Sequence, residues 1–220
     1  MMNVPFQDVV HLLPRWTTSR YQARVHAVTI TRDALDELLT ALSEQLASLD
    51  ADSELVVIGG SALLALDLIQ RTTMDVDVVA IAEGGELHLA APLPPALQTA
   101  SDRVRRDFGL DERWLNAGPT DLLRWGLPEG FLGRAHTRRY GTALTIHFAG
   151  RLDQIHFKLY AMVDQAGGRH EADLRALGPT SEELIAAAKW TTSQDPSEGF
   201  RMMLEQALER LGVDHVDLGT

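Results

Sequence analysis

The chain has 220 residues, no cysteine, 45% hydrophobic residues and a formal net charge of −11. This length fits one domain, or a compact core with a small helical appendage, and the lack of cysteine excludes disulfides and thiolate metal sites. The negative charge argues against a surface that coats nucleic acid. No apolar run is long enough for a membrane span, and the first thirty residues show no apolar stretch of a signal peptide. We therefore expect a cytoplasmic protein without a membrane segment.

Hydrophobic spacing predicts alternating helices and strands in the first half of the chain. Leucines recur at helical spacing after Thr31, whose side chain suits an N-cap position. Short apolar runs bounded by glycine or polar residues predict strands. The predicted elements are helices over about 31–50, 61–70 and 96–108, strands over about 55–58 and 75–81, and a loop over about 83–95.

Helices dominate the predicted second half. Thr142 to Phe148 alternates in the manner of a strand, and Thr180 with Glu183 gives the signature of a capping box. The other predicted elements are helices over about 120–125, 152–164, 171–177, 180–192 and 197–212. The chain is therefore expected to form an α/β (α+β) fold, with a small mixed sheet flanked by helices and a helical C-terminal part.

Two carboxylates stand at the start of the second predicted strand. Side chains alternate along a strand, so Asp75 and Asp77 share one face. Two like charges this close repel each other unless they are solvated or share a cation. Hard oxygen ligands suit Mg²⁺, which usually combines one or two carboxylates with substrate phosphates. The pair is interpreted either as a metal site or as two solvated acids on an edge strand.

A glycine turn precedes this strand by a short helix. Backbone N–H groups of Gly59-Gly60-Ser61, together with the Ser61 hydroxyl, can cradle a phosphate at a helix N-terminus. Such a turn more often serves only backbone geometry. The order of the two features is more informative than either alone.

The combination G-G-S-A-L at residues 59–63 and R-T-T-x-D-V-D at residues 71–77 resembles the signature of the DNA-polymerase-β-type nucleotidyltransferase superfamily. Its particular form is similar to AbiEii-type nucleotidyltransferases of type IV toxin–antitoxin systems. The resemblance implies a nucleotidyltransferase fold, with a core in residues 1–150 and a C-terminal helical part in residues 151–220 that completes the site.

The same resemblance implies roles for individual residues. Asp75 and Asp77 would bind Mg²⁺ or Mn²⁺, and Gly59, Gly60 and Ser61 would hold the phosphates of an NTP substrate. A second element, Lys158-Leu-Tyr-Ala followed by Arg169 to Leu174, resembles a downstream motif of that group. By analogy Lys158 contacts the nucleotide phosphates and Asp173 supports it; otherwise Lys158 snorkels from an amphipathic helix. Arg71 either contacts a phosphate or pairs with Asp67.

The superfamily usually adds a third carboxylate from a later strand, and here the predicted strand over 142–148 contains no acid. Asp153, just beyond it, is the candidate for the base or third metal ligand. Without a third acid, the chain is alternatively a catalytically inactive module that binds nucleotide or protein. A glycosyltransferase and an antitoxin-like structural partner are further alternatives.

The resemblance also suggests an acceptor. Residues 101–151 contain nine arginines against six acids, so a local basic patch could meet phosphates, although the arginines fit solvated helix faces equally well. A tRNA 3′ end is the expected acceptor, and a cognate antitoxin is a possible partner.

Overall fold

The computed structural model describes residues 28–165 and 168–213. The expectation that the first thirty residues contain no signal peptide concerns mainly residues 1–27, which lie outside the described residues. The described elements, in chain order, are α1 (Arg32–Ala47), β1 (Ser53–Ile58), α2 (Gly59–Ala65), β2 (Val76–Glu83), β3 (Glu86–Leu89), α3 (Pro95–Phe108), β4 (Leu115–Asn116), the 3₁₀ helix η1 (Gly118–Trp125), α4 (Phe131–Arg134), β5 (His136–Tyr140), β6 (Leu144–Phe148), α5 (Arg151–Asp164), α6 (Gly168–Ala176), α7 (Ser181–Gln194) and α8 (Glu198–Arg210).

The strands form one mixed sheet in the order β3-β2-β1-β6-β5, and β4 pairs with β2 outside this path. The central strand β1 is antiparallel to β2 and parallel to β6. β4 runs parallel to β2, beside its first residues. The ends of β1 and β6 therefore meet the beginnings of β2 and β4 at one edge of the sheet. The predicted mixed sheet flanked by helices is confirmed.

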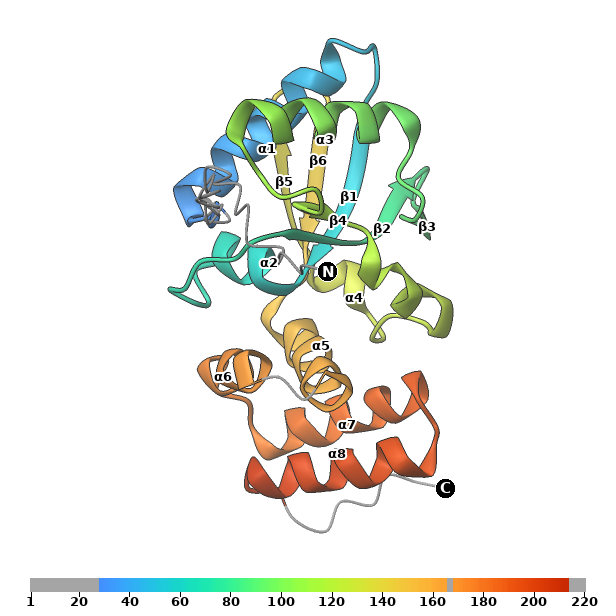
Figure 1. Cartoon of the computed structure of the whole chain (residues 1–220). Helices are drawn as coiled ribbons and strands as arrows, with labels where there is room; N and C mark the ends of the chain where they lie inside the picture. The colour runs from blue at the N-terminus through green and yellow to red at the C-terminus, as the bar shows by residue number, and fades with distance from the viewer. Residues whose placement is uncertain (1–27, 166–167, 214–220) are drawn as a thin grey trace, which may run out of the picture.

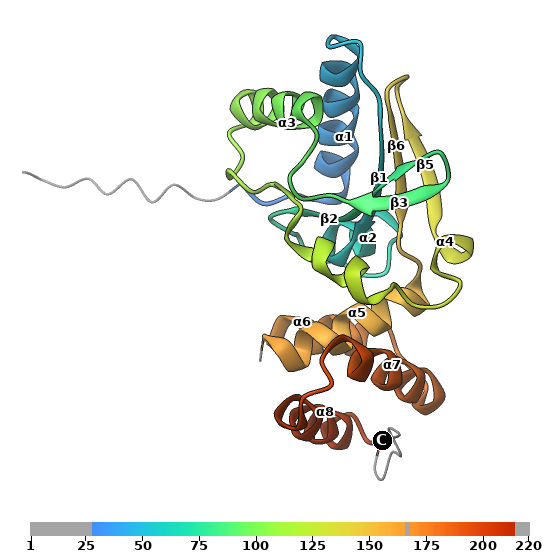
Figure 2. The same cartoon turned by 90° about the vertical axis from the view of Figure 1, so that its right-hand side faces the viewer.

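Alternation along β1 divides the apolar core between the two faces of the sheet. Leu55 and Val57 belong to a large cluster that includes α1 and α3, whereas Val56 and Ile58 belong to a smaller cluster with Phe131 of α4. Helices α1 and α3 lie together on one side of the sheet (Figures 1 and 2). The period-2 pattern of strand side chains thus produces a sheet buried on both faces.

The helices α5 to α8 lie together at one end of the sheet, as Figure 1 shows. The capping box before α7 is present: Thr180 Oγ1 accepts from Glu183 N (3.2 Å), and Thr180 N donates to Glu183 Oε2 (2.9 Å). α5 packs mainly against α6 and α7, and it also contacts α2. This contact brings the C-terminal helices against the part of the sheet where β1 ends.

The loop predicted over 83–95 is wrong in its first part, because residues 86–89 form β3. Gly84 and Gly85 both have positive φ, at 60° and 87°, which suits a two-residue turn between antiparallel strands. The short strand β4 and the arginine-containing β5 are also additional to the predicted elements. Helix α2 begins two residues before its predicted start and ends at Ala65, shortly before Asp67, whose φ is 57°. Within the described ranges, no helix combines the length and apolar character needed to cross a bilayer.

Candidate functional site

A cleft of about 510 Å³ lies between helices α5 and α6 and the edge of the sheet at which β1 ends and β2 begins. Its wall includes residues from segments that are far apart in the sequence. Its glycine and polar positions include Gly59, Asp75, Asp77, Asn116, Lys158, Arg169 and His170. The sheet topology explains this assembly, because β1 ends where β2 and β4 begin.

Asp75 and Asp77 both line the cleft, as their shared face of β2 predicts. Asp75 immediately precedes β2, and its Oδ1 accepts a hydrogen bond from Thr73 Oγ1 (3.2 Å). Asp77 is the register partner of Ile58, the last residue of β1. This register brings Gly59 against Asp77, where an added Cβ atom would overlap Asp77 Oδ2. Gly59 is thus required by the close approach of the turn to the carboxylate.

Asp77 is electrostatically strained. Burial and the nearby charge of Asp75 raise its pKa to about 6, against the opposing effects of a hydrogen bond from Asn116 and the charges of Lys158 and Arg169. Asn116 Nδ2 donates to Asp77 Oδ1 at 2.8 Å. A strand position that costs this much electrostatic free energy is typical of a functional site rather than of a solvated edge.

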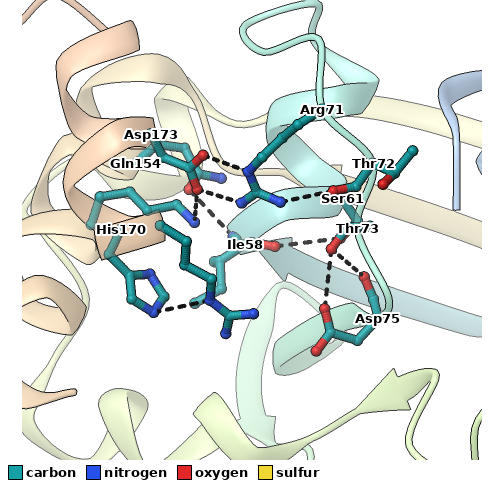
Figure 3. A network of polar contacts seen from close by, with 12 residues as sticks. Ile58, Ser61, Arg71, Thr72, Thr73, Asp75, Gln154, His170 and Asp173 are labelled. Carbon is teal, nitrogen blue, oxygen red and sulfur yellow. Dashed lines mark hydrogen bonds and ion pairs between the residues drawn. The ribbon is translucent and has the colours of Figure 1, made fainter. Parts of the chain in front are cut away.

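Asp173 on α6 joins two cationic side chains. Lys158 Nζ lies 2.8 Å from Asp173 Oδ2, and both side chains are almost fully buried. Arg71, in the segment between α2 and β2, reaches across to Asp173 (Figure 3), with Nε at 2.7 Å from Oδ1 and Nη2 at 2.5 Å from Oδ2. Burial alone would raise the pKa of Asp173, but the hydrogen bonds from Arg71 and Lys158 outweigh it and hold that pKa below its ordinary value. The network positions Lys158 in the cleft wall.

The glycine turn lies next to the cleft, but only Gly59 lines it. Ser61 is fully buried, and its hydroxyl is 3.5 Å from the Ile58 carbonyl oxygen. Gly59 N already donates to Gln154 Oε1 (3.3 Å). An added Cβ at Gly60 would come within 2.7 Å of Thr73 Oγ1, so this glycine permits close packing of the segment before β2. Phosphate binding by Gly60 and Ser61 stays a prediction.

Asp153 lies outside the cleft wall and is fully buried. Both of its oxygens accept from Arg134, with Nη2 at 2.6 Å from Oδ1 and Nε at 3.2 Å from Oδ2. This placement gives no support to Asp153 as the base or third ligand. The predicted alternative, an ion pair between Arg71 and Asp67, is wrong. Asp67 pairs with Arg32, and Arg71 pairs with Asp173.

Asn116, Arg169 and His170 also line the cleft, and the sequence pattern assigns no role to them. Asn116 stands on a two-residue strand, which is too short to produce a periodic signal. Arg169 and His170 belong to the downstream motif, in which the resemblance implies roles for Lys158 and Asp173. His170 is 92% buried; its Nε2 is 3.1 Å from Gln165 Oε1, and its Nδ1 has no partner among the described residues. Arg169 acts on the charge of Asp77, and this proximity can be found only from the fold, because the two residues are far apart in the sequence.

The donor set at this edge fits a hard divalent cation. Asp75 and Asp77 supply two carboxylates, which is the usual protein contribution to a Mg²⁺ bound with substrate phosphates. Within residues 28–165 and 168–213, no group of three His, Cys, Asp or Glu side chains is arranged to hold a metal. Among the described residues, Asp75 and Asp77 are therefore the acidic ligands available to such a site, and substrate phosphates and water can supply further ligands.

Residues 33–101 match a family model described as "nucleotidyltransferase of unknown function (DUF6036)". The matched region contains the glycine turn, Asp75 and Asp77, and it ends before Lys158 and Asp173. Comparison with curated proteins and with solved structures gave no match. Over residues 33–101 the chain is thus similar to a nucleotidyltransferase family, and this region includes Asp75 and Asp77, which the mixed sheet brings to the cleft.

Proposed function

We propose that the protein is a metal-dependent nucleotidyltransferase, which moves an NMP from an NTP to an acceptor hydroxyl. The observation that carries this proposal is the meeting of Asp75, Asp77 and Lys158 in the wall of one cleft. The first two can hold a cation, and the third can bind phosphate. The family match over residues 33–101 supports the same reaction class.

In the proposed reaction the acceptor hydroxyl oxygen forms a bond to the α-phosphorus and releases its proton to water. The bond between the α-phosphorus and the oxygen that bridges to the β-phosphate breaks, and pyrophosphate leaves. A Mg²⁺ or Mn²⁺ ion held by Asp75 and Asp77 would stabilise charge on the phosphate oxygens. Lys158 contributes a compact positive charge for the phosphates. Asp173 fixes the Lys158 ammonium by an ion pair of 2.8 Å, so little side-chain entropy is lost when phosphate binds.

The acceptor is proposed to be an RNA end, with a tRNA 3′ end as the first candidate. Arg113 and Arg169 line the cleft and can contact backbone phosphates. Trp125, also in the wall, is 67% exposed and offers a stacking surface for an unpaired base. These features allow a single-stranded end to enter although the whole chain is acidic.

The test is incubation of the purified protein with each labelled NTP, Mg²⁺ and total tRNA. Label should enter RNA with the wild-type protein and should be lost with Asp75→Ala. Asp121→Ala is a matched control, because Asp121 is a largely exposed cleft acid that already pairs with Arg124. Absence of label, or equal label with Asp75→Ala, would contradict the proposal.

A second candidate function, a nucleotide-binding module without transfer activity, is favoured because no third acid joins Asp75 and Asp77 in a metal-binding group among the described residues. Calorimetry with NTP and Mg²⁺, run beside the transfer assay, separates the two functions. Binding without transfer supports the module. The toxin–antitoxin context, including a cognate antitoxin, rests on the resemblance alone; growth of a bacterial host expressing wild type or Asp75→Ala tests it.

A further inference from the structure

Asn116 stands beside Asp77 at the edge of the sheet. β4 pairs with β2 in parallel, and Asp77 and Asn116 are partners in the register. The Asn116 amide has a defined orientation: its Oδ1 accepts from Gly118 N (3.0 Å), and its Nδ2 donates to Asp77 Oδ1 (2.8 Å). A rotated amide would lose the first bond and would place an oxygen against the carboxylate.

This amide contributes no charge at a position where a carboxylate would lie directly beside Asp77. Its N–H also occupies one acceptor direction of Asp77 Oδ1, which is then less available to a cation. Among the described residues no other acid, histidine or cysteine joins Asp75 and Asp77 to make a group of three. Residues 28–165 and 168–213 therefore offer a cation at this position the two negative charges of Asp75 and Asp77.

The cationic side chains around Asp75 and Asp77 weaken the attraction between these carboxylates and a divalent cation. Lys158 and Arg169 are close enough to Asp77 to act on its charge, and the positively charged Arg71 is close enough to Asp75 for that acid to raise the pKa of the guanidinium. A free divalent cation approaching the two carboxylates meets these positive groups. A triphosphate reverses the balance, because it supplies negative charge to the cationic groups and oxygen ligands to the metal.

We infer that Asn116 makes cation binding conditional on nucleotide: the site takes up Mg²⁺ together with the triphosphate and binds the cation alone only weakly. This inference rests on the proposed function. Asn116 acts here as a positioning residue, which orients Asp77 and keeps the site one charge short of retaining a metal by itself.

The experiment uses Mn²⁺ and follows the electron paramagnetic resonance signal of the free ion. Binding is measured with and without the α,β-methylene analogues of ATP, GTP, CTP and UTP, each in turn. For the wild type, one analogue should tighten Mn²⁺ binding roughly tenfold or more, within the usual range of coupling between two ligands. Asn116→Asp should bind Mn²⁺ without nucleotide about tenfold more tightly than the wild type, a change typical of groups next to metal ligands.

Asn116→Ala is the matched control for charge. It removes the amide and adds no carboxylate, so its Mn²⁺ binding without nucleotide should stay weak. Equal Mn²⁺ affinity of the wild type with and without an analogue that it binds would overturn the inference and leave the proposed function standing. Failure of all four analogues to bind, with or without Mn²⁺, would overturn the proposed function itself. The wild-type comparison requires no variant, so the inference is testable even if Asn116→Asp does not fold.

Discussion

Gly59 packs directly against the Asp77 carboxylate, and only hydrogen at residue 59 leaves room for this contact. Gly59 also has a φ of 72°, in the left-handed region that glycine adopts most easily. One residue therefore carries two separate requirements, one of backbone conformation and one of space. The contact joins the end of β1 to the carboxylate that is proposed to bind metal.

Gly59→Ala is expected to destabilise the protein by roughly 2 to 5 kcal/mol, the sum of a left-handed alanine and an overpacked contact. It should also weaken binding of Mn²⁺ with nucleotide, since the new methyl group displaces Asp77. Gly84→Ala is the control, because Gly84 has a φ of 60° and no neighbour within 4 Å of an added Cβ. That variant should lose about 1 to 2 kcal/mol and no binding. Urea unfolding measures the stability of both variants. Equal losses of stability would exclude a contribution from the contact between residue 59 and Asp77.

Asp173→Asn tests the network that positions Lys158. The change leaves a buried ammonium facing a neutral amide, and the expected cost is roughly 3 kcal/mol, at the low end for a broken buried pair because Arg71 is 38% exposed. Nucleotide affinity should fall with it. Glu171→Gln, on the same helix, removes only an i,i+4 pair with Arg175 and should cost at most about 0.5 kcal/mol. A similar small loss for both variants would contradict the proposed role of Asp173.

The sequence predicted the residues that the fold brings to the cleft better than it predicted their partners. Asp75 and Asp77 follow from strand alternation, which is a local rule, and Lys158 followed only from resemblance. Asp173 was assigned a supporting role, but its contact with Arg71 joins α6 to the segment before β2 and depends on tertiary packing.

Other features could not be predicted because they lack a periodic signal. β4 has two residues, so the position of Asn116 beside Asp77 depends on a pairing that spans much of the chain. Asp153 stood next to the site in the sequence, but its helix α5 directs it into the ion pair with Arg134. Closeness in the sequence to the strand β6 did not identify a third metal ligand, because Asp153, the acid that follows this strand, pairs with Arg134.

Asp77→Asn should stabilise the protein in the absence of metal. The raised pKa, about 6, means that the native state holds a proton more tightly than the unfolded chain, so ionised Asp77 lowers stability above pH 6. The variant should exceed the wild type by about 1 to 2 kcal/mol at pH 8, and the difference should shrink as pH falls from 7 to 4. Asp121→Asn, at a largely exposed cleft acid, should change stability by less than about 0.5 kcal/mol. Unfolding in urea across this pH range checks the expectation; a destabilised Asp77→Asn at pH 8 would refute it.

Asp153→Asn should affect stability and leave binding intact. Its carboxylate is fully buried against Arg134, so the expected loss is about 3 kcal/mol. Binding of Mn²⁺ with an NTP analogue should match the wild type at a temperature where both proteins are folded, in contrast to Asp75→Ala. A folded Asp153→Asn that binds normally and transfers no label would instead restore Asp153 as the base.

His170 should make stability fall in mild acid. Burial, followed by the charges of Lys158 and Arg169, lowers its pKa to about 4, whereas a histidine of the unfolded chain takes a proton near pH 6.5. Its contribution is therefore complete above about pH 6.5 and is lost as pH falls toward 4, because the unfolded chain binds the proton first. Relative to His170→Gln, the wild type should lose roughly 2 kcal/mol between pH 7 and pH 4. Effects of Asp77 and His156 are common to both proteins and cancel in this difference. A pH-independent difference would mean that His170 has the same pKa in the native protein as in the unfolded chain, and it would refute this expectation.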